Sequence, residues 1–420
     1  MNKQDIKKVI VAQKESHSEL HYVEREEGLT PVAVGADPFV RIFSGVRRCG
    51  KSTMMDHIRN SGAEKNFSLN FDDNRLIGFT SGDFEKLYEA FHELYDPEKT
   101  WYFDEIQNIK GWELFIRRLH NEGHKVLITG SNANMLSREL GTHLTGRYLQ
   151  TEIFPFSFTE YCWFREIRIE PNDFYSPAKT TILKKAFQDY MTNGGFPEYL
   201  RSGNPDYLEI LFENILYRDV IARFNIRNGR LLMEMTHFLI SNIAKETSYN
   251  SLKNTFSLAN AITVKEYISY LEDCYLLFSI NKFDYSLKKQ LANPKKIYCV
   301  DSGMAGIVSF QFSENFGRKL ENLVFLHLRR TGADIYYHRE NHGCDFIEVS
   351  HKKVVRAIQV CQSIEPITVR QREINGLIEA MKTYQLHTGL IITEDDEETI
   401  EHNGFTIQVV PAWKFLLIDH

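Results

Sequence analysis

The stretch RIFSGVRRCGKSTMMDHI, residues 41–58, places a glycine-containing loop between two different hydrophobic patterns. Apolar residues at 40–43 predict a short buried strand, and the apolar spacing at 54–58 is typical of a helix. The loop between them, from Gly45 to Ser52, has the spacing G-x-x-x-x-G-K-S. Its glycines permit backbone angles that turn successive N–H groups inward, and the following helix points its positive end at the same place. The stretch therefore predicts a phosphate-binding loop.

A loop of this kind binds the phosphates of a nucleoside triphosphate. Lys51 is expected to reach the β- and γ-phosphates, and Ser52 is expected to ligate Mg²⁺. ATP and Mg²⁺ are the predicted cofactors. The residues predicted to bind the nucleotide are Gly45, Val46, Arg47, Arg48, Cys49, Gly50, Lys51, Ser52 and Thr53.

A second motif makes a chance match improbable. The stretch WYFDEIQNI begins at Trp101 and is an apolar strand that ends in Asp104 and Glu105. Asp104 is predicted to hold Mg²⁺, directly or through water, and Glu105 is predicted to polarise the attacking water. The two motifs in this order predict an ATPase.

Polar residues after a third apolar strand, 126–129, complete the predicted site. Either Ser131 or Asn132 is expected to contact the γ-phosphate and the water; the alternative is an ordinary turn at the end of a strand. A guanidinium group stabilises charge on a transferring phosphoryl group, in the same chain or from a neighbouring subunit. Arg147 or Arg138 is the candidate for this role. Glu105, Asn132 and Arg147 are thus the predicted catalytic residues.

The composition is that of a globular protein in a reducing compartment. The net charge of −6 excludes a uniformly basic nucleic-acid binder, so any DNA contact needs a local patch. The six cysteines form no C-x-x-C pair, which argues against a zinc or redox motif. No apolar run approaches the length of a membrane span. A cytoplasmic protein with no membrane partner is expected.

The chain of 420 residues is long enough for roughly two to four domains. We predict an α/β fold, with a P-loop parallel sheet and crossover helices, then a helical and winged-helix connector, then a second α/β domain. The predicted boundaries are 1–36 for an N-terminal helical segment, 37–164 for the P-loop domain, 165–235 for a helical connector, 236–294 for a winged-helix-like unit and 295–420 for the C-terminal domain.

The chain resembles prokaryotic AAA-type ATPases that carry a C-terminal domain of unknown function related to the PD-(D/E)xK nuclease fold. The likeness covers about Asp37 to Val410. It rests on the motifs SGVRRCGKST, YFDEIQ, ITGSN, GRYLQTEIFPFSFTEY, NGGFPEYL, YLEDCYLL, KIYCVDSG, GRKLENLVFLHL, GCDFIEV and AIQVCQS. Arg147 matches the Gly-Arg position of this family. The resemblance implies an ATP-binding module, a helical connector with a winged-helix-like unit, and a nuclease-like terminal domain.

Residues 248–283 predict a helix-turn-helix followed by a wing. Thr263 and Glu266 have the spacing of a capping box, and apolar residues at i, i+3, i+4 and i+7 follow on one helix face. Such a unit would bind DNA or serve only in domain packing. The lysines expected to meet DNA phosphates are Lys288, Lys289, Lys295 and Lys296.

The nuclease-like resemblance implies a Mg²⁺ site in the C-terminal domain. Glu321 and Asp345 match its acidic positions. The acid-x-lysine expected on the next strand is replaced by Gln359 and Cys361, so we expect no cleavage of DNA. The arginines that would have to replace the missing lysine are Arg370 and Arg372.

Together these observations predict Mg²⁺-dependent ATP binding and slow ATP hydrolysis that acts as a switch. Two other functions stay open, an ATP-regulated DNA-binding protein or nuclease, and a signalling scaffold with protein partners. A homo-oligomer is also a candidate assembly.

Overall fold

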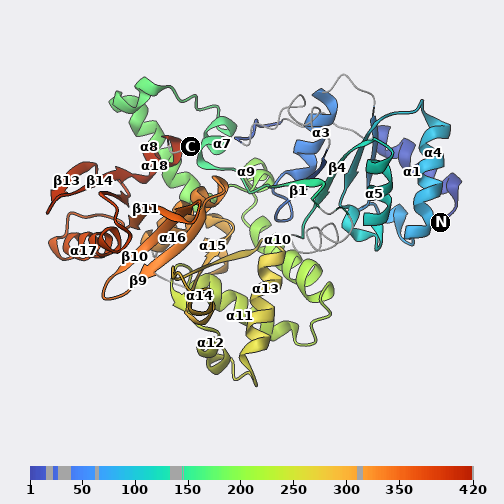
Figure 1. Ribbon diagram of the computed structural model, residues 1–420. Helices are drawn as coiled ribbons and strands as arrows, with labels where there is room; N and C mark the ends of the chain where they lie inside the picture. The colour runs from blue at the N-terminus through green and yellow to red at the C-terminus, as the bar shows by residue number, and fades with distance from the viewer. Residues whose placement is uncertain are drawn as a thin grey trace. The chain divides into compact units, whose positions relative to one another are not determined.

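The chain divides into two compact units in the computed structural model (Figure 1). The first unit comprises residues 1–154 together with 273–275, and the second comprises 155–272 and 276–420. The structure describes residues 1–15, 22–26, 39–61, 66–132, 144, 146–309 and 316–418.

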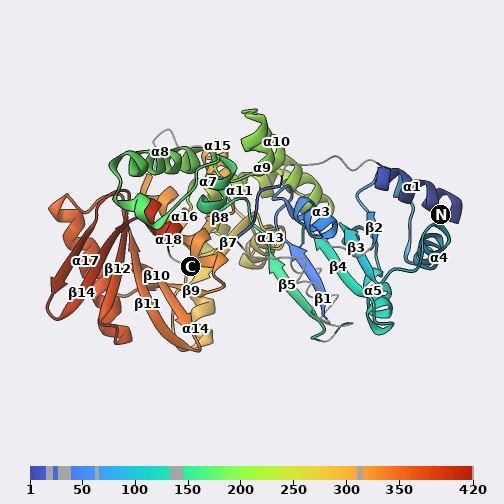
Figure 2. The ribbon, with the colours of Figure 1, turned by 90° about the horizontal axis from the view of Figure 1, so that it is seen from above.

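A five-stranded parallel sheet forms the first unit, with strand order β2-β3-β4-β1-β5 (Figure 2). Parallel neighbours need crossover connections, which helices provide here. The predicted parallel sheet with crossover helices is therefore confirmed. The strands are β1 (Val40–Ser44), β2 (Asn66–Asn70), β3 (Thr100–Asp104), β4 (Lys125–Gly130) and β5 (Tyr148–Glu152). The helices are α1 (Lys3–Glu15), α3 (Lys51–Ser61), α4 (Phe84–Leu94) and α5 (Trp112–Asn121), with short 3₁₀ turns at Asn74–Leu76, Ser81–Asp83 and Ile106–Asn108.

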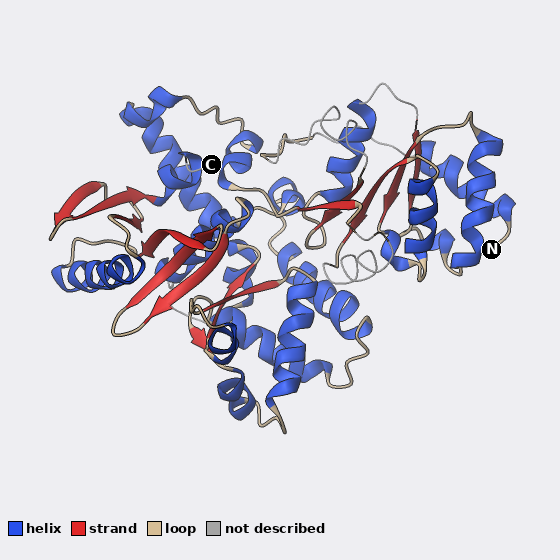
Figure 3. Ribbon diagram, viewed as in Figure 1, coloured by secondary structure: helices blue, strands red, loops and turns tan. Residues whose placement is uncertain are grey.

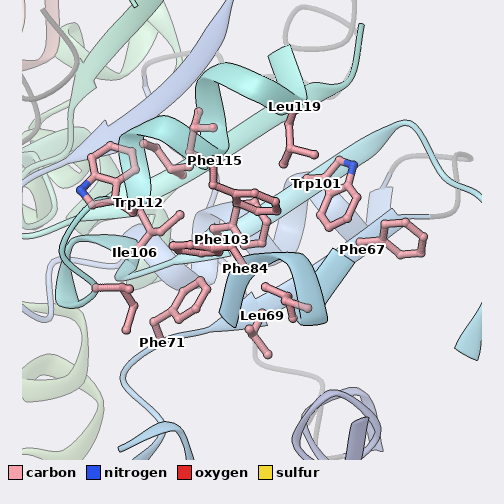
Figure 4. Packing of buried hydrophobic residues seen from close by; sticks show 14 of the residues in the cluster. Phe67, Leu69, Phe71, Phe84, Trp101, Phe103, Ile106, Trp112, Phe115 and Leu119 are labelled. Carbon is pink, nitrogen blue, oxygen red and sulfur yellow. The ribbon is translucent and has the colours of Figure 1, made fainter. Parts of the chain in front are cut away.

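The core of the first unit is aromatic (Figure 4). Every residue of β3 is buried, because β2 and β4 pair with its two edges and helices cover its faces. Trp101 on β3 is fully buried, with its ring centroid 4.7 Å from that of Phe67 and 5.4 Å from that of Phe91. The strand that ends in Asp104 is thus anchored along its whole length.

The N-terminal helix α1 is part of the first unit, whereas the sequence placed residues 1–36 in a separate segment. Its apolar face, Ile6, Val9 and Ile10, is buried in the same core. Lys3 adds ion pairs to Glu89 and Glu93 of α4. Most of the remainder of the predicted segment lies outside the described residues.

The division between the units falls at Phe154 and Pro155, earlier than the predicted boundary after residue 164. The reason is α7 (Phe158–Phe164), which packs on α8 (Pro177–Asn193) of the second unit. The ring of Phe158 lies 5.5 Å from that of Phe187. Apolar packing, not chain position, assigns this helix.

A three-stranded antiparallel sheet, β6-β8-β7, lies in the second unit with helices before and between its strands. The order along the chain is a helix, a short strand, two helices, a strand, a short helix and a strand. The identity of this unit as a helix-turn-helix with a wing stays a prediction. The predicted limits 236–294 differ from those of the unit, because β8 pairs with β6 and β7 and so completes this sheet. The elements are α11 (Gly229–Ser241), β6 (Glu246–Thr247), α12 (Tyr249–Thr255), α13 (Ala261–Asp273), β7 (Leu277–Asn281), α14 (Leu287–Ala292) and β8 (Lys295–Cys299).

Helices precede and follow this three-stranded sheet along the chain of the second unit. Besides α7 and α8, they include the 3₁₀ helix Pro171–Tyr175, α9 (Pro197–Ser202), α10 (Tyr207–Asn214), the π-helix Ile215–Ala222 and α15 (Ser302–Val308).

A six-stranded mixed sheet completes the second unit, in the order β13-β14-β12-β11-β10-β9 (Figure 3). The predicted C-terminal α/β domain is present, but its strand order alone does not identify it as nuclease-related. Among the helices that the structure describes, none has the length and apolar character to cross a membrane. The elements are α16 (Phe316–Arg330), β9 (Asp334–Arg339), β10 (Gly343–Ser350), β11 (Lys353–Val360), α17 (Ile367–Tyr384), β12 (Thr388–Thr393), β13 (Glu398–His402), β14 (Phe405–Pro411) and α18 (Ala412–Ile418).

Candidate nucleotide-binding site

The glycine-containing loop lies at the carboxyl edge of the parallel sheet, between β1 and α3. Gly45 follows β1 where a Cβ atom would lie 2.0 Å from the carbonyl oxygen of Ile153, so only glycine fits there. Gly50 has a φ of 103°, and even Arg48 has a positive φ of 66°. This unusual backbone produces the tight loop that precedes the first turn of α3.

Lys51 is enclosed by its own loop. Its side chain is 3% exposed, and its ammonium donates to the carbonyl oxygens of Gly45 at 3.0 Å and Val46 at 2.9 Å. A phosphate bound in the loop would take over these donors. The ammonium is therefore positioned inside the loop.

Ser52 and Asp104 meet although they lie far apart in the chain. The Ser52 hydroxyl, in the first turn of α3, donates to the Asp104 carboxylate at 2.9 Å. A hydroxyl and a carboxylate at the carboxyl edge of the sheet are oxygen ligands of the kind that Mg²⁺ prefers. The two residues predicted from the motifs to hold the metal thus fit that role.

Burial is the main influence on the Asp104 carboxyl. It raises the pKa of Asp104 above its ordinary range, and the neighbouring Glu105 adds to the rise. The hydroxyls of Thr129 and Ser52, which donate to the carboxylate, act in the opposite direction. A cation bound here would favour the ionised carboxylate.

Glu105 adopts a backbone conformation that is rare for its residue type, with φ 51° and ψ 38°. Its N–H donates to the Thr129 hydroxyl at 3.0 Å, while its carboxylate accepts hydrogen bonds from Gln107 and, at 3.4 Å, from Ser131. Strain of this kind persists only where surrounding contacts enforce it. The carboxylate of Glu105 is thereby oriented from two sides.

Ser131 and Asn132 both lie at the carboxyl end of β4 and are both buried, at 1% and 2% exposure. Ser131 donates to the Glu105 carboxylate at 3.4 Å and so helps to orient it. A catalytic role of Asn132 stays a prediction.

Of the two alternatives for Arg147, the same chain or a neighbouring subunit, its position does not fit the first. Arg147 precedes β5, and Tyr148 pairs with Val40 at the start of β1, so the arginine lies at the amino edge of the sheet. Val40 and Ser44 are four residue steps apart along β1, which is about 13 Å at ~3.3 Å per residue. The exposed guanidinium donates instead to Asn121 at 3.1 Å. The alternative candidate, Arg138, lies outside the described residues.

The contacts that two residues of the site, Thr129 and Arg25, make there were not predicted from the sequence. Thr129 bonds both Asp104 and Glu105, yet a threonine at the end of a strand is an ordinary strand residue. Arg25 is 5% exposed and donates to the carbonyl oxygens of Cys49 and Phe154, so it ties an N-terminal segment to the phosphate loop. The charged stretch around Arg25, rich in Glu and Arg, does not predict this contact.

The predicted patch of DNA-binding lysines is wrong for two of its members. Lys295 and Lys296 are buried on β8, with 9% and 8% exposure, because β8 lies between β6 and β7. Only Lys288 and Lys289 of the predicted patch are exposed.

In the second unit, the predicted acidic residues Glu321 and Asp345 come together, and Lys296 is the cation that joins them. The arginines considered as substitutes are engaged elsewhere, Arg370 with Glu398 and Arg372 with Glu373. Burial raises the pKa of Glu321 to about 7, the Asp345 charge adds to the rise, and Lys296 opposes it.

The pKa of Lys296 itself is raised. Burial alone lowers it, but the charges of Asp345 and Glu321 outweigh that effect, so this side chain is an ammonium.

Comparison with protein families finds two matches. A model described as an AAA domain matches residues 38–162, and a domain of unknown function (DUF8612) matches residues 184–315. The uncharacterized protein MJ1544 of Methanocaldococcus jannaschii is 34% identical over 398 residues, covering 90% of this chain and 88% of the relative. An uncharacterized protein of Haemophilus influenzae is 26% identical over 393 residues, covering 89% of this chain and 94% of the relative.

The solved structures that resemble this chain have much lower sequence identity to it. The Holliday junction branch migration motor RuvB of Thermotoga maritima has 14% identity and a TM-score of 0.24, and the match covers 66% of this chain and 87% of that one. Cdc6p of Pyrobaculum aerophilum has 10% identity and a TM-score of 0.26, covering 73% of this chain and 97% of that one. Similarity this low carries no information about function.

Proposed function

Because this chain belongs to the family of MJ1544 and contains an AAA domain at residues 38–162, we propose that it binds ATP with Mg²⁺ and hydrolyses it slowly, as a switch. One observation carries the proposal. Lys51, Ser52, Asp104 and Glu105, from two distant segments, lie at the same edge of the parallel sheet. Nucleotides bind at this edge in open α/β sheets.

Each residue has a distinct task. The loop N–H groups and Lys51 bind the phosphates, while Ser52 and Asp104 hold Mg²⁺, which supplies positive charge beside the phosphates. Glu105 accepts a proton from the attacking water, and Ser131 orients its carboxylate.

Slow turnover by a single chain is supported by the position of Arg147, which lies at the far edge of the sheet in its own chain. An arginine from a neighbouring subunit of a homo-oligomer would supply the missing positive charge and accelerate the reaction.

We expect Lys51→Ala to weaken ATP binding by about ten- to a hundred-fold. The substitution removes a charge-assisted contact worth roughly 1.5–3 kcal/mol. Calorimetric titration of the full chain with ATP and Mg²⁺ measures this affinity.

The exposed Lys8 on α1 offers a matched control, and Lys8→Ala should bind ATP as the unmodified chain does. An unchanged affinity in Lys51→Ala would refute the assignment of the loop.

DNA binding is a second candidate function, supported by the helix and strand order around β6, α13 and β8. Since only Lys288 and Lys289 of the predicted patch are exposed, few phosphates can be neutralised. We expect weak binding of duplex DNA with a log–log salt slope of about −2. Fluorescence anisotropy at several salt concentrations measures it.

The double variant Lys288→Ala/Lys289→Ala should remove most of that slope. Lys352→Ala/Lys353→Ala makes the same change of charge at another exposed place, the start of β11, and should have little effect. Equal slopes for the two variants would exclude DNA contact through the wing and favour a scaffold with protein partners.

A further inference from the structure

A buried ammonium joins two carboxylates in the second unit. Lys296 of β8 lies 2.9 Å from Glu321 of α16 and 2.7 Å from Asp345 of β10. Both Lys296 and Glu321 are 8% exposed. The hydroxyl of Tyr298 also donates to Glu321, at 2.8 Å. Three elements that are separate in the chain thus converge on one cation.

The neighbouring strand holds Asp345 in place. The second carboxylate oxygen of Asp345 accepts the N–H of Val360 at 3.0 Å, and the N–H of Asp345 donates to Gln359 at 3.2 Å. The oxygen that remains is the one bound to Lys296. Asp345 is therefore fixed in the position that faces the ammonium.

The cluster lines a cleft of about 900 Å³ whose other charged groups are mainly basic. One side-chain nitrogen of Arg318 is buried without a hydrogen-bond partner among the residues that the structure describes. The basic side chains that line the cleft besides Lys296 are Lys245, Arg318, Arg339 and Arg372.

The resemblance noted from the sequence implies Mg²⁺ between Glu321 and Asp345, and the residues do not fit that ion. One carboxylate oxygen of each residue already binds Lys296. Mg²⁺ requires oxygens at ~2.0–2.1 Å and would have to displace the ammonium. At such short separations, the repulsion between the ammonium and a divalent ion is large.

We propose that Lys296 is a resident cation that takes the place of a divalent metal between Glu321 and Asp345. The ammonium neutralises the paired carboxylates and joins the three-stranded sheet to α16 and β10. The cleft consequently binds neither Mg²⁺ nor Mn²⁺ between these two carboxylates.

Titration of the full chain with Mn²⁺, followed by electron paramagnetic resonance without nucleotide, tests the proposal. Lys296→Met removes the charge and keeps most of the side-chain volume. This variant should bind one Mn²⁺ more than the unmodified chain, because the two carboxylates no longer have the ammonium between them. Adding Asp345→Asn should abolish the gain. A folded Lys296→Met variant with no additional Mn²⁺ overturns the proposal.

A second comparison does not depend on the folding of Lys296→Met. Asp345→Asn keeps the shape of the side chain, and Lys296 retains Glu321 as its partner. The unmodified chain and Asp345→Asn should bind the same number of Mn²⁺ ions. A Mn²⁺ site that is present in the unmodified chain and absent from Asp345→Asn would show that a metal occupies the cleft despite Lys296, and would overturn the proposal.

Discussion

Glu105→Gln should retain ATP and lose turnover by roughly 10²–10⁴-fold, the range typical of a lost general base. Glutamine has almost the same size and can still accept hydrogen bonds from Gln107 and Ser131. It cannot accept a proton from water at neutral pH. Single-turnover hydrolysis and calorimetric ATP binding on the same preparation separate the two effects.

The exposed Glu122 at the end of α5 provides the matched control for this experiment. Glu122→Gln makes the same chemical change away from the carboxyl edge of the sheet and should hydrolyse ATP normally. If Glu105→Gln hydrolysed ATP at the unmodified rate, the base would have to be Asp104 or a residue at the end of β4. ATP binding lost together with turnover would instead indicate a structural role for Glu105.

Trp101→Ala should lower the free energy of unfolding of the first unit by about 3–5 kcal/mol, the cost of removing a fully buried large aromatic side chain. The Trp101 ring packs against the ring of Phe67 on β2 (Figure 4) and against that of Phe91 on α4. The cavity would also loosen β3, which carries Asp104 and Glu105 at its end. Urea-dependent proteolysis of the full chain, scored on fragments of the first unit, measures the loss.

Trp101→Phe distinguishes loss of packing from loss of a hydrogen bond. The indole N–H has no partner among the described residues, so phenylalanine removes volume but no hydrogen bond. We expect it to cost clearly less than alanine. Leu114 of α5, which is 49% exposed and belongs to the same unit, gives the surface control, and its alanine variant should change stability by at most ~1 kcal/mol. Equal losses for Trp101→Ala and Leu114→Ala would contradict the role of Trp101 in the core.

The elements of the nucleotide site that could be predicted are those in which strand, loop and helix are adjacent in the chain. The spacing from Gly45 to Ser52 needs only its own backbone angles and the start of α3 to form a loop. The apolar run before Asp104 likewise marks a buried strand by composition alone. Parallel pairing then brings the ends of β1 and β3 to one edge, as the alternation of strands and helices predicts.

The residues that could not be predicted depend on which strands pair and in which register. Arg147 was assigned from a motif, but the pairing of Tyr148 with Val40 sends it to the opposite edge. The roles of Thr129 and Arg25 were not predicted, because they depend on contacts with residues far away in the chain.

Lys296 is the clearest example of a residue whose surroundings depend on distant segments of the chain. Lys296 lies in a lysine-rich stretch, and this pattern predicts exposed side chains, because lysine is almost never fully buried unless paired. The antiparallel pairing of β8 with β6 and β7 buries it, and α16 and β10 supply the two carboxylates that stabilise its charge. The sequence by itself determined the phosphate loop and the acidic strand end, because both are local in the chain. Only the tertiary structure decided which distant charges meet, because an ammonium can be buried only where other segments provide its counter-charges.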